Sequence, residues 1–159
     1  MATLSSRAKE IVKKAKAEGL KIATAESCTG GLIASSIVSI PGASDIFWGA
    51  FVSYAIDAKV ALLGLDKSFL DKNGAVNRET AAAMAKAALE KSGVDIALSA
   101  TGYADTGLVY IGLAKKGQGR AEIQPEVYEK HFEGGRNTVR KAAALFALAL
   151  LEETIKNGV

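Results

Sequence analysis

Apolar and polar positions follow two different periods along the chain, and these periods predict a succession of helices and strands. Residues 4 to 18 carry apolar side chains three or four positions apart with lysines between them, which predicts an amphipathic helix ended by Gly19. Residues 21 to 25 are β-branched at alternate positions, as in a short strand. A glycine-containing turn follows, and residues 32 to 38 resume a helical pattern. The beginning of the chain therefore predicts a helix followed by a strand, turn, helix unit.

The middle of the chain continues this alternation. Residues 46 to 54 (IFWGAFVSY) are apolar enough to predict a strand buried on both faces. Residues 56 to 64 and 67 to 72 predict two short helices. Residues 80 to 91 are rich in alanine and follow Asn77, a residue type that caps helix N-termini, so they predict a longer helix.

The last third predicts three strands and a long helix. Residues 94 to 100 and 108 to 114 are apolar strands separated by seven residues, too few for a helical crossover, so we expect them to pair antiparallel. Residues 122 to 132 are more polar and include Pro125, as in an edge strand. The final helix runs from about residue 136 to 155.

Strands interleaved with helices predict the α/β class, with helices on both faces of the sheet. We expect a three-layer α/β/α sandwich whose sheet is mixed, mostly parallel and about five-stranded. The 159 residues contain no linker or repeat, so we expect residues 1–159 to form a single domain.

Composition and charge indicate which kinds of partner the protein binds and in which cellular compartment it works. The 20 Lys and Arg residues are mixed with 17 Asp and Glu, and neither a basic stripe nor an aromatic platform points to nucleic acid. Residues 1 to 19 alternate charged with apolar positions, so they resemble neither a signal peptide nor a membrane span. Cys28 is the only cysteine, which excludes an internal disulfide and fits a reducing compartment. We therefore expect a cytoplasmic protein without a membrane or nucleic-acid partner.

The loop of residues 24 to 31 (TAESCTGG) carries the candidate chemistry. It follows a predicted strand, where ligands bind in open α/β sheets, and it offers hydroxyls, a thiol, a carboxylate and backbone N–H groups. Its adjacent glycines fit neither a Walker A loop nor a Rossmann fingerprint. Two interpretations stay open at this point: a helix cap followed by close-packed glycines, or a site for an anion or oxyanion.

Ser27 in this loop needs a base if it is to act as a nucleophile. The one histidine, His131, lies in the polar edge strand and is expected at the surface. Lys59 is the remaining candidate, because it precedes the apolar run VALL and a desolvated lysine can lose its proton near neutral pH. A solvated helix lysine is the alternative. Cys28 competes as a nucleophile, but a lone cysteine is more often a small buried apolar residue.

Other charged residues carry two interpretations each. Glu26 either caps neighbouring N–H groups or exchanges protons. Arg136 and Arg140 begin the last helix after two glycines, where an arginine can bind phosphate or lie at the surface.

Several separated segments match one known family in order and spacing. They are residues 24–32 (TAESCTGGL), 40–44 (IPGAS), 52–54 (VSY) with 58–59 (AK), 63–65 (LGL), 73–76 (NGAV), 108–114 (LVYIGLA) and 132–140 (FEGGRNTVR). Over nearly its whole length the chain resembles the CinA C-terminal domain family.

The resemblance implies an amidohydrolase that converts nicotinamide mononucleotide to nicotinic acid mononucleotide and ammonia, as in bacterial pyridine-nucleotide recycling. It implies a serine/lysine mechanism without metal or cofactor, in which Ser27 is the nucleophile and Lys59 the general base. Tyr54 would relay a proton or orient the ring. The substrate-binding residues expected on this basis are Glu26, Thr29, Gly30, Gly31, Thr101, Gly102, Arg136 and Arg140. The family also self-associates, and Trp48 and the polar edge strand could line such an interface.

Three departures from the family pattern bear on the substrate. A glycine- and proline-rich stretch after the strand 94–100 is reduced to residues 101–107, Tyr-Ser-Asn-Glu-Ala-Lys is reduced to YAIDAK at residues 54–59, and Gly135 replaces an acidic residue. Two alternatives therefore stay open: a catalytically silent nucleotide-binding or assembly module, and a serine amidase with a different amide substrate.

Overall fold

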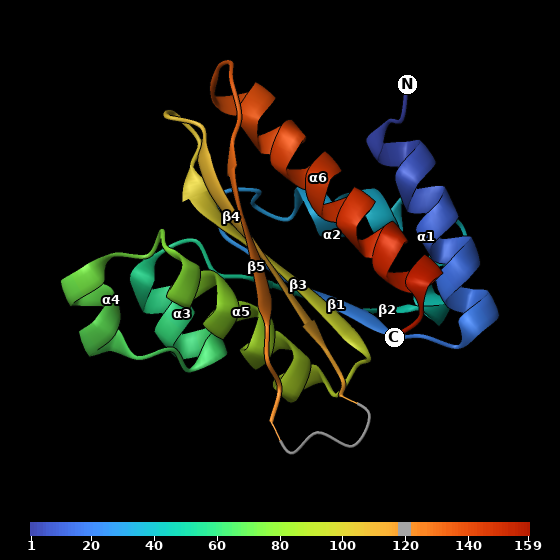
Figure 1. Ribbon diagram of the computed structural model, residues 1–159, viewed down its shortest axis with the longest axis horizontal. Helices are drawn as coiled ribbons and strands as arrows, with labels where there is room; N and C mark the ends of the chain where they lie inside the picture. The colour runs from blue at the N-terminus through green and yellow to red at the C-terminus, as the bar shows by residue number, and fades with distance from the viewer. Residues whose placement is uncertain (118–121) are drawn as a thin grey trace.

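A five-stranded sheet with the strand order β2-β1-β3-β4-β5 runs through the centre of the molecule (Figure 1). The computed structural model describes residues 1–117 and 122–159. β1 pairs parallel with β2 and β3, whereas β4 is antiparallel to both β3 and β5. Four strands thus share one direction, which confirms the mixed, mostly parallel sheet. The strands are β1 (Ile22–Glu26), β2 (Phe47–Val52), β3 (Ile96–Tyr103), β4 (Leu108–Lys115) and β5 (Glu126–His131).

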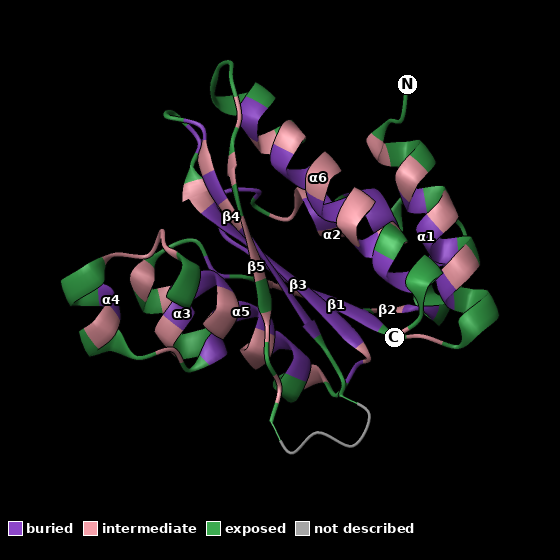
Figure 2. Ribbon diagram, in the orientation of Figure 1, coloured by how far each residue is buried: buried purple, intermediate pink, exposed green. Residues whose placement is uncertain are grey.

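Helices cover both faces of this sheet, as the sequence predicts (Figure 1). One face is covered by α1 (Leu4–Glu18), α2 (Leu32–Val38) and α6 (Arg136–Asn157). The other carries α3 (Ile56–Leu63), α4 (Lys67–Asn73) and α5 (Arg78–Ser92), and a short 3-10 helix spans Ala43–Asp45. Two apolar cores lie between these layers, and Figure 2 shows that the central strands β1 and β3 are the most completely buried elements. None of the helices within the described residues is both long and apolar enough to span a bilayer.

Two helix ends, at Asn77 and Gly19, lie where the sequence predicts caps, and the structure adds a capping box at Thr3. The Thr3 hydroxyl accepts from the N–H of Ser6, and the Ser6 hydroxyl accepts from the N–H of Thr3, which begins α1. Asn77 Oδ1 accepts from the N–H of Thr80 at 2.8 Å and begins α5. Gly19 ends α1 with a left-handed backbone at φ 66°.

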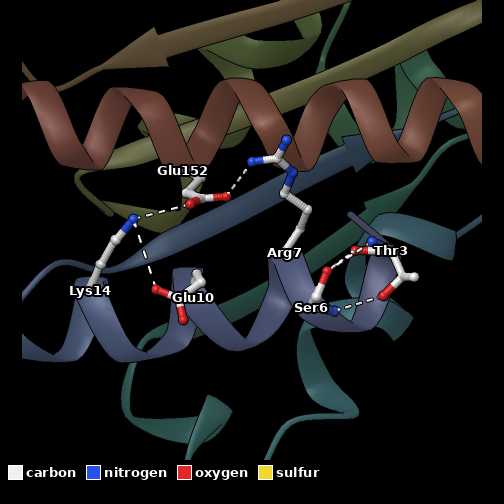
Figure 3. A network of polar contacts seen from close by, with 6 residues as sticks. All are labelled: Thr3, Ser6, Arg7, Glu10, Lys14 and Glu152. Atoms are coloured by element: carbon white, nitrogen blue, oxygen red, sulfur yellow. Dashed lines mark hydrogen bonds and ion pairs between the residues drawn. The ribbon is translucent and has the colours of Figure 1, made fainter. Parts of the chain in front are cut away.

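A polar contact joins the first helix to the last (Figure 3). The Glu152 carboxylate of α6 accepts from Arg7 at 2.8 Å and from Lys14 at 3.0 Å, both on α1. The hydrogen bond from Arg7 lowers the pKa of Glu152 below its usual value. This contact fixes the α1–α6 layer, which carries the first residues of α6 to the end of the sheet.

A strand forms within residues 46 to 54, as predicted, but the prediction that both of its faces are buried is wrong. β2 is an edge strand, and side chains such as Trp48 and Val52 are 54% and 46% exposed. Its apolar sequence resembles that of a central strand, but burial depends on strand order, which hydrophobic periodicity does not report. At the other edge, β5 begins directly after Pro125, because proline has no N–H for the ladder.

Candidate active site

The turn after β1 presents Ser27 at the carboxyl end of the sheet. The N–H of Ser27 donates to the carbonyl of Ala100 in β3 at 2.9 Å, and its carbonyl accepts from the N–H of Gly30 at 3.0 Å. Gly30 and Gly31 have left-handed φ angles of 59° and 96°, which favour glycine. The two glycines are thus required by the turn that places Ser27.

Glu26 anchors this turn to α2. Its fully buried carboxylate accepts four hydrogen bonds: from the hydroxyls of Thr24 and Thr29 at 3.0 and 2.8 Å, and from the N–H groups of Ile33 and Ala34, each at 2.9 Å. A carboxylate at a helix N-terminus is stabilised by these N–H groups and by the helix dipole. Of the two interpretations of Glu26, the structure therefore shows the cap, and it places Thr29 within the same buried network.

Lys59 on α3 contacts the Ser27 side chain. Its Nζ lies 2.9 Å from Ser27 Oγ, 2.7 Å from the Ser53 carbonyl oxygen and 3.0 Å from the Tyr54 carbonyl oxygen. The side chain is fully buried, and no carboxylate contacts Nζ in the part of the chain that the structure describes. The contact that the serine/lysine interpretation requires is thus present.

Burial without a counter-ion disfavours the charged form of this lysine. Desolvation lowers the pKa of Lys59 from 10.5 to about 8. A neutral amine has two N–H donors and one lone pair, and the carbonyls of Ser53 and Tyr54 can take both N–H groups. The lone pair is then left for the hydroxyl proton of Ser27. The arrangement can therefore activate a serine near neutral pH.

A pocket of about 290 Å³ is lined by two residues that adjoin the dyad: Cys28 follows Ser27 in the chain, and Tyr54 holds Lys59 through its carbonyl. Its lining residues are Cys28, Tyr54, Gly102, Tyr103, Ala104, Asp105, Thr106 and Arg136. Arg136, the first residue of α6, donates to the Tyr54 hydroxyl and to Asp105 Oδ2, each at 3.0 Å. The described lining includes neither Ser27 nor Lys59, so the pocket places the exposed Arg136 guanidinium next to neighbours of the dyad, Tyr54 and Cys28.

Of three expected substrate-binding residues, two make hydrogen bonds to backbone carbonyls and one lines the pocket. Arg140 donates to the carbonyls of Cys28 and Thr29 at 3.0 and 3.1 Å, so it holds the turn rather than facing the pocket. Thr101 is buried and donates to the Ala75 carbonyl at 2.7 Å. Gly102 lines the pocket, and a Cβ there would lie 2.7 Å from the Leu108 carbonyl oxygen, so only glycine fits without a shift.

The two competing candidates are less suited to the chemistry. Cys28 is buried, and this burial raises the pKa of its thiol to about 11, which disfavours the thiolate. His131 lies on β5 with an exposed side chain beside Glu129. Its surface position is the one expected from the sequence.

Ser53 and Asp105 contact residues of this site, and neither of them was assigned a role from the sequence. The Ser53 carbonyl accepts from Lys59, and the Ser53 hydroxyl is buried without a hydrogen-bond partner among the described residues. Ser53 lies in the family-matching segment VSY, but its contact with Lys59 is made by the backbone, so the identity of its side chain gave no reason to assign it a role. Asp105 pairs with Arg136, and it is the one acidic residue in the shortened loop 101–107, a signal that could have identified it. Residues 1–117 and 122–159 contain no cluster of three or more His, Cys, Asp or Glu side chains that could hold a metal ion.

Comparisons with known proteins agree with this architecture. A sequence model described as the CinA C-terminal domain matches residues 4–155. A CinA-like protein of Syntrophomonas wolfei is 44% identical over 149 residues, which cover 88% of this chain and 34% of the relative. A CinA-like protein of Kosmotoga olearia is 40% identical over 154 residues, which cover 91% of this chain and 36% of the relative. This chain thus spans about a third of the length of these relatives.

Solved structures show the same fold. A CinA superfamily protein from Escherichia coli superposes with a TM-score of 0.87 at 30% identity, covering 96% of this chain and 91% of that one. A competence/damage inducible protein from Agrobacterium tumefaciens gives a TM-score of 0.86 at 33% identity, covering 95% of this chain and 94% of that one.

Proposed function

Because this chain belongs to the CinA C-terminal domain family, we propose that it hydrolyses a carboxamide with Ser27 as nucleophile and Lys59 as general base. The proposed substrate is nicotinamide mononucleotide, and the products are nicotinic acid mononucleotide and ammonia. The observation that carries the proposal is the 2.9 Å contact between Ser27 Oγ and a buried Lys59 Nζ without a counter-ion among the described residues.

The first step is acylation of Ser27. Ser27 Oγ attacks the carboxamide carbon while its proton moves to the lone pair of Lys59 Nζ. Backbone N–H groups near Thr29 to Gly31 would hold the oxyanion of the tetrahedral intermediate, except that of Gly30, which donates to the Ser27 carbonyl. As the C–N bond breaks, Lys59 returns the proton to the leaving nitrogen, which departs as ammonia. An ester between Ser27 and the acid remains.

The second step uses the same groups in reverse order. Lys59 takes a proton from water, the hydroxide formed attacks the ester carbon, and the proton returns to Ser27 Oγ as the acid leaves. Tyr54 is well placed to orient the substrate, because its side chain lines the pocket while its carbonyl holds Lys59. Arg136 supplies the cation that would face a phosphate.

The experiment that tests this function is a measurement of ammonia release from nicotinamide mononucleotide and from a panel of simpler amides. Ser27→Ala and Lys59→Met should each lose at least about a thousandfold in kcat, the scale of removing a nucleophile or its base. Lys72→Met, an exposed lysine of α4, is the matched control and should retain the wild-type rate.

The same experiment separates the alternatives. A folded protein that binds the nucleotide without releasing ammonia from any amide would support a catalytically silent module. Turnover of simple amides without turnover of the mononucleotide would support a serine amidase of different specificity. The proposal includes a cytoplasmic location, which fits the reduced Cys28 and which cell fractionation can test.

A further inference from the structure

The pocket lined by Tyr54 and Cys28 contains an ion pair between two of its lining residues, Arg136 and Asp105. Arg136 Nη1 lies 3.0 Å from Asp105 Oδ2, and the two side chains are 49% and 74% exposed. The second terminal nitrogen of the guanidinium, Nη2, donates to the Tyr54 hydroxyl. Among the lining residues that the structure describes, Arg136 and Asp105 are the only charged ones. The pocket therefore carries no net charge at neutral pH.

Asp105 is held at this position by a tight connection between β3 and β4. The Tyr103 carbonyl accepts from the N–H groups of Thr106 and Gly107 at 3.2 and 2.9 Å. The Gly107 carbonyl in turn accepts from the N–H of Phe132 at 2.9 Å, in the segment that leads into α6. Gly107 has a φ of 89°, and a Cβ there would lie 2.0 Å from the Phe132 carbonyl oxygen. The loop is thus fastened to the chain that positions Arg136.

The Asp105 carboxylate beside Arg136 disfavours the binding of an anionic group to that arginine. A phosphate that binds Arg136 must replace the Asp105 carboxylate or lie next to it, and two like charges at such a distance repel. An uncharged group at the same place meets no such penalty. Because the ion pair is exposed, solvent and salt weaken the effect without removing it.

We infer that Asp105 is a specificity-determining residue that competes with the substrate for Arg136 and lowers the preference of the site for a phosphate. The inference rests on the proposed amidohydrolase function. It assigns to this chain a broader substrate class, carboxamides with or without a phosphate at this end of the pocket. Nicotinamide riboside then binds as a substrate alongside the mononucleotide.

The test measures binding, so that it does not depend on turnover. Calorimetry gives the Kd of nicotinamide mononucleotide and of nicotinamide riboside for Ser27→Ala and for Ser27→Ala with Asp105→Asn. The ratio of the two affinities should shift by about five- to tenfold toward the mononucleotide when Asp105 is neutralised, and the shift should shrink at high salt. Asp71→Asn in the same background is the control, because it makes the same charge change on α4.

Two outcomes would overturn the inference: an unchanged affinity ratio in Asp105→Asn, or the absence of binding of both compounds. Ammonia release by the wild type is measured in parallel. A changed ratio without ammonia release would sustain the role of Asp105 and reject the amidohydrolase. Ammonia release with an unchanged ratio would do the reverse.

Discussion

At the residue scale, the polar partners of Lys59 Nζ in the described part of the chain are all uncharged. Its Nζ meets one hydroxyl and two carbonyl oxygens, and its side chain is fully buried. An ammonium in this place has three acceptors but no opposite charge, so desolvation is offset only in part. Both the reactivity of Ser27 and the pH dependence of the protein follow from this arrangement.

Activity should therefore depend on the protonation of Lys59. The base is competent only when neutral, and its pKa is lowered to about 8. We expect kcat/KM to rise about tenfold per unit of pH below about pH 8 and to level off above it. A pH profile of ammonia release checks this. A rate that stays constant, or falls, as the pH rises from about 6 to 8 would exclude a neutral amine as the base.

Stability should respond to the same proton. Because the folded pKa of Lys59 lies below its unfolded value of 10.5, the unfolded chain binds more protons between these two pKa values, and stability rises with pH there. From about pH 8 to about pH 10.5 this group contributes a gain of about 3 kcal/mol. Urea unfolding of Lys59→Met over this range should lack that gain, whereas Lys72→Met should keep it. Parallel curves for the wild type and Lys59→Met would contradict the lowered pKa.

At the scale of elements, the strand, turn, helix unit is held by a carboxylate from the strand rather than by a cap on the helix itself. Gly31 at the N-cap position of α2 provides no side chain, and Glu26 of β1 accepts the N–H groups of Ile33 and Ala34 instead. The strand end, the turn and the helix therefore depend on one buried group.

The substitution Glu26→Gln should destabilise the protein, because it weakens the hydrogen bonds that join β1, the turn and α2. An amide replaces one carboxylate oxygen with an N–H₂ donor, which faces one hydroxyl that can turn to accept and one backbone N–H that loses its acceptor, so we expect a loss of about 2–4 kcal/mol in the free energy of unfolding. Glu152→Gln is the control, because its partly exposed contacts to Arg7 and Lys14 should cost about 1 kcal/mol or less. Equal losses in the two variants, measured by urea unfolding, would argue against the special role of Glu26.

The sequence was informative where local chemistry decides the structure. Gly19 and Asn77 delimit helices, and the short gap predicted after residue 100, which is only the four residues 104–107 between β3 and β4, leaves no room for a helical crossover and gives antiparallel pairing. The sequence predicted wrongly that β2 is buried on both faces, because its apolar residues lie in a strand at the edge of the sheet. Lys59 was predictable as a candidate from its neighbours, and the structure adds the contacts with backbone carbonyls. Those contacts depend on how α3 packs beneath the turn, a tertiary arrangement that local patterns do not encode.

At the scale of the whole molecule, the edge strand β2 leaves an apolar surface. Trp48 is 54% exposed and stacks on Phe51 with ring centroids 5.5 Å apart. A pocket adjoins it, lined by residues that include Val38, Ile40 and Phe47. An exposed apolar strand edge is a common site of association. The self-association expected from the sequence stays a prediction, and β2 is the surface to test.

Trp48→Arg should shift the protein toward the monomer in light scattering, because a charge on β2 opposes burial of this edge. Leu62→Arg is the matched control, since Leu62 is an exposed apolar residue of α3 on a helical layer away from β2. A wild-type mass equal to that of the monomer at all concentrations would reject self-association of this chain.

The most direct test of the serine/lysine account is mass spectrometry of the protein quenched with acid during turnover of nicotinamide mononucleotide, with peptide mapping. The account predicts an acyl adduct on Ser27 that is absent in Ser27→Ala and in Lys59→Met. An adduct on the neighbouring Cys28, or undiminished ammonia release by Ser27→Ala, would contradict it.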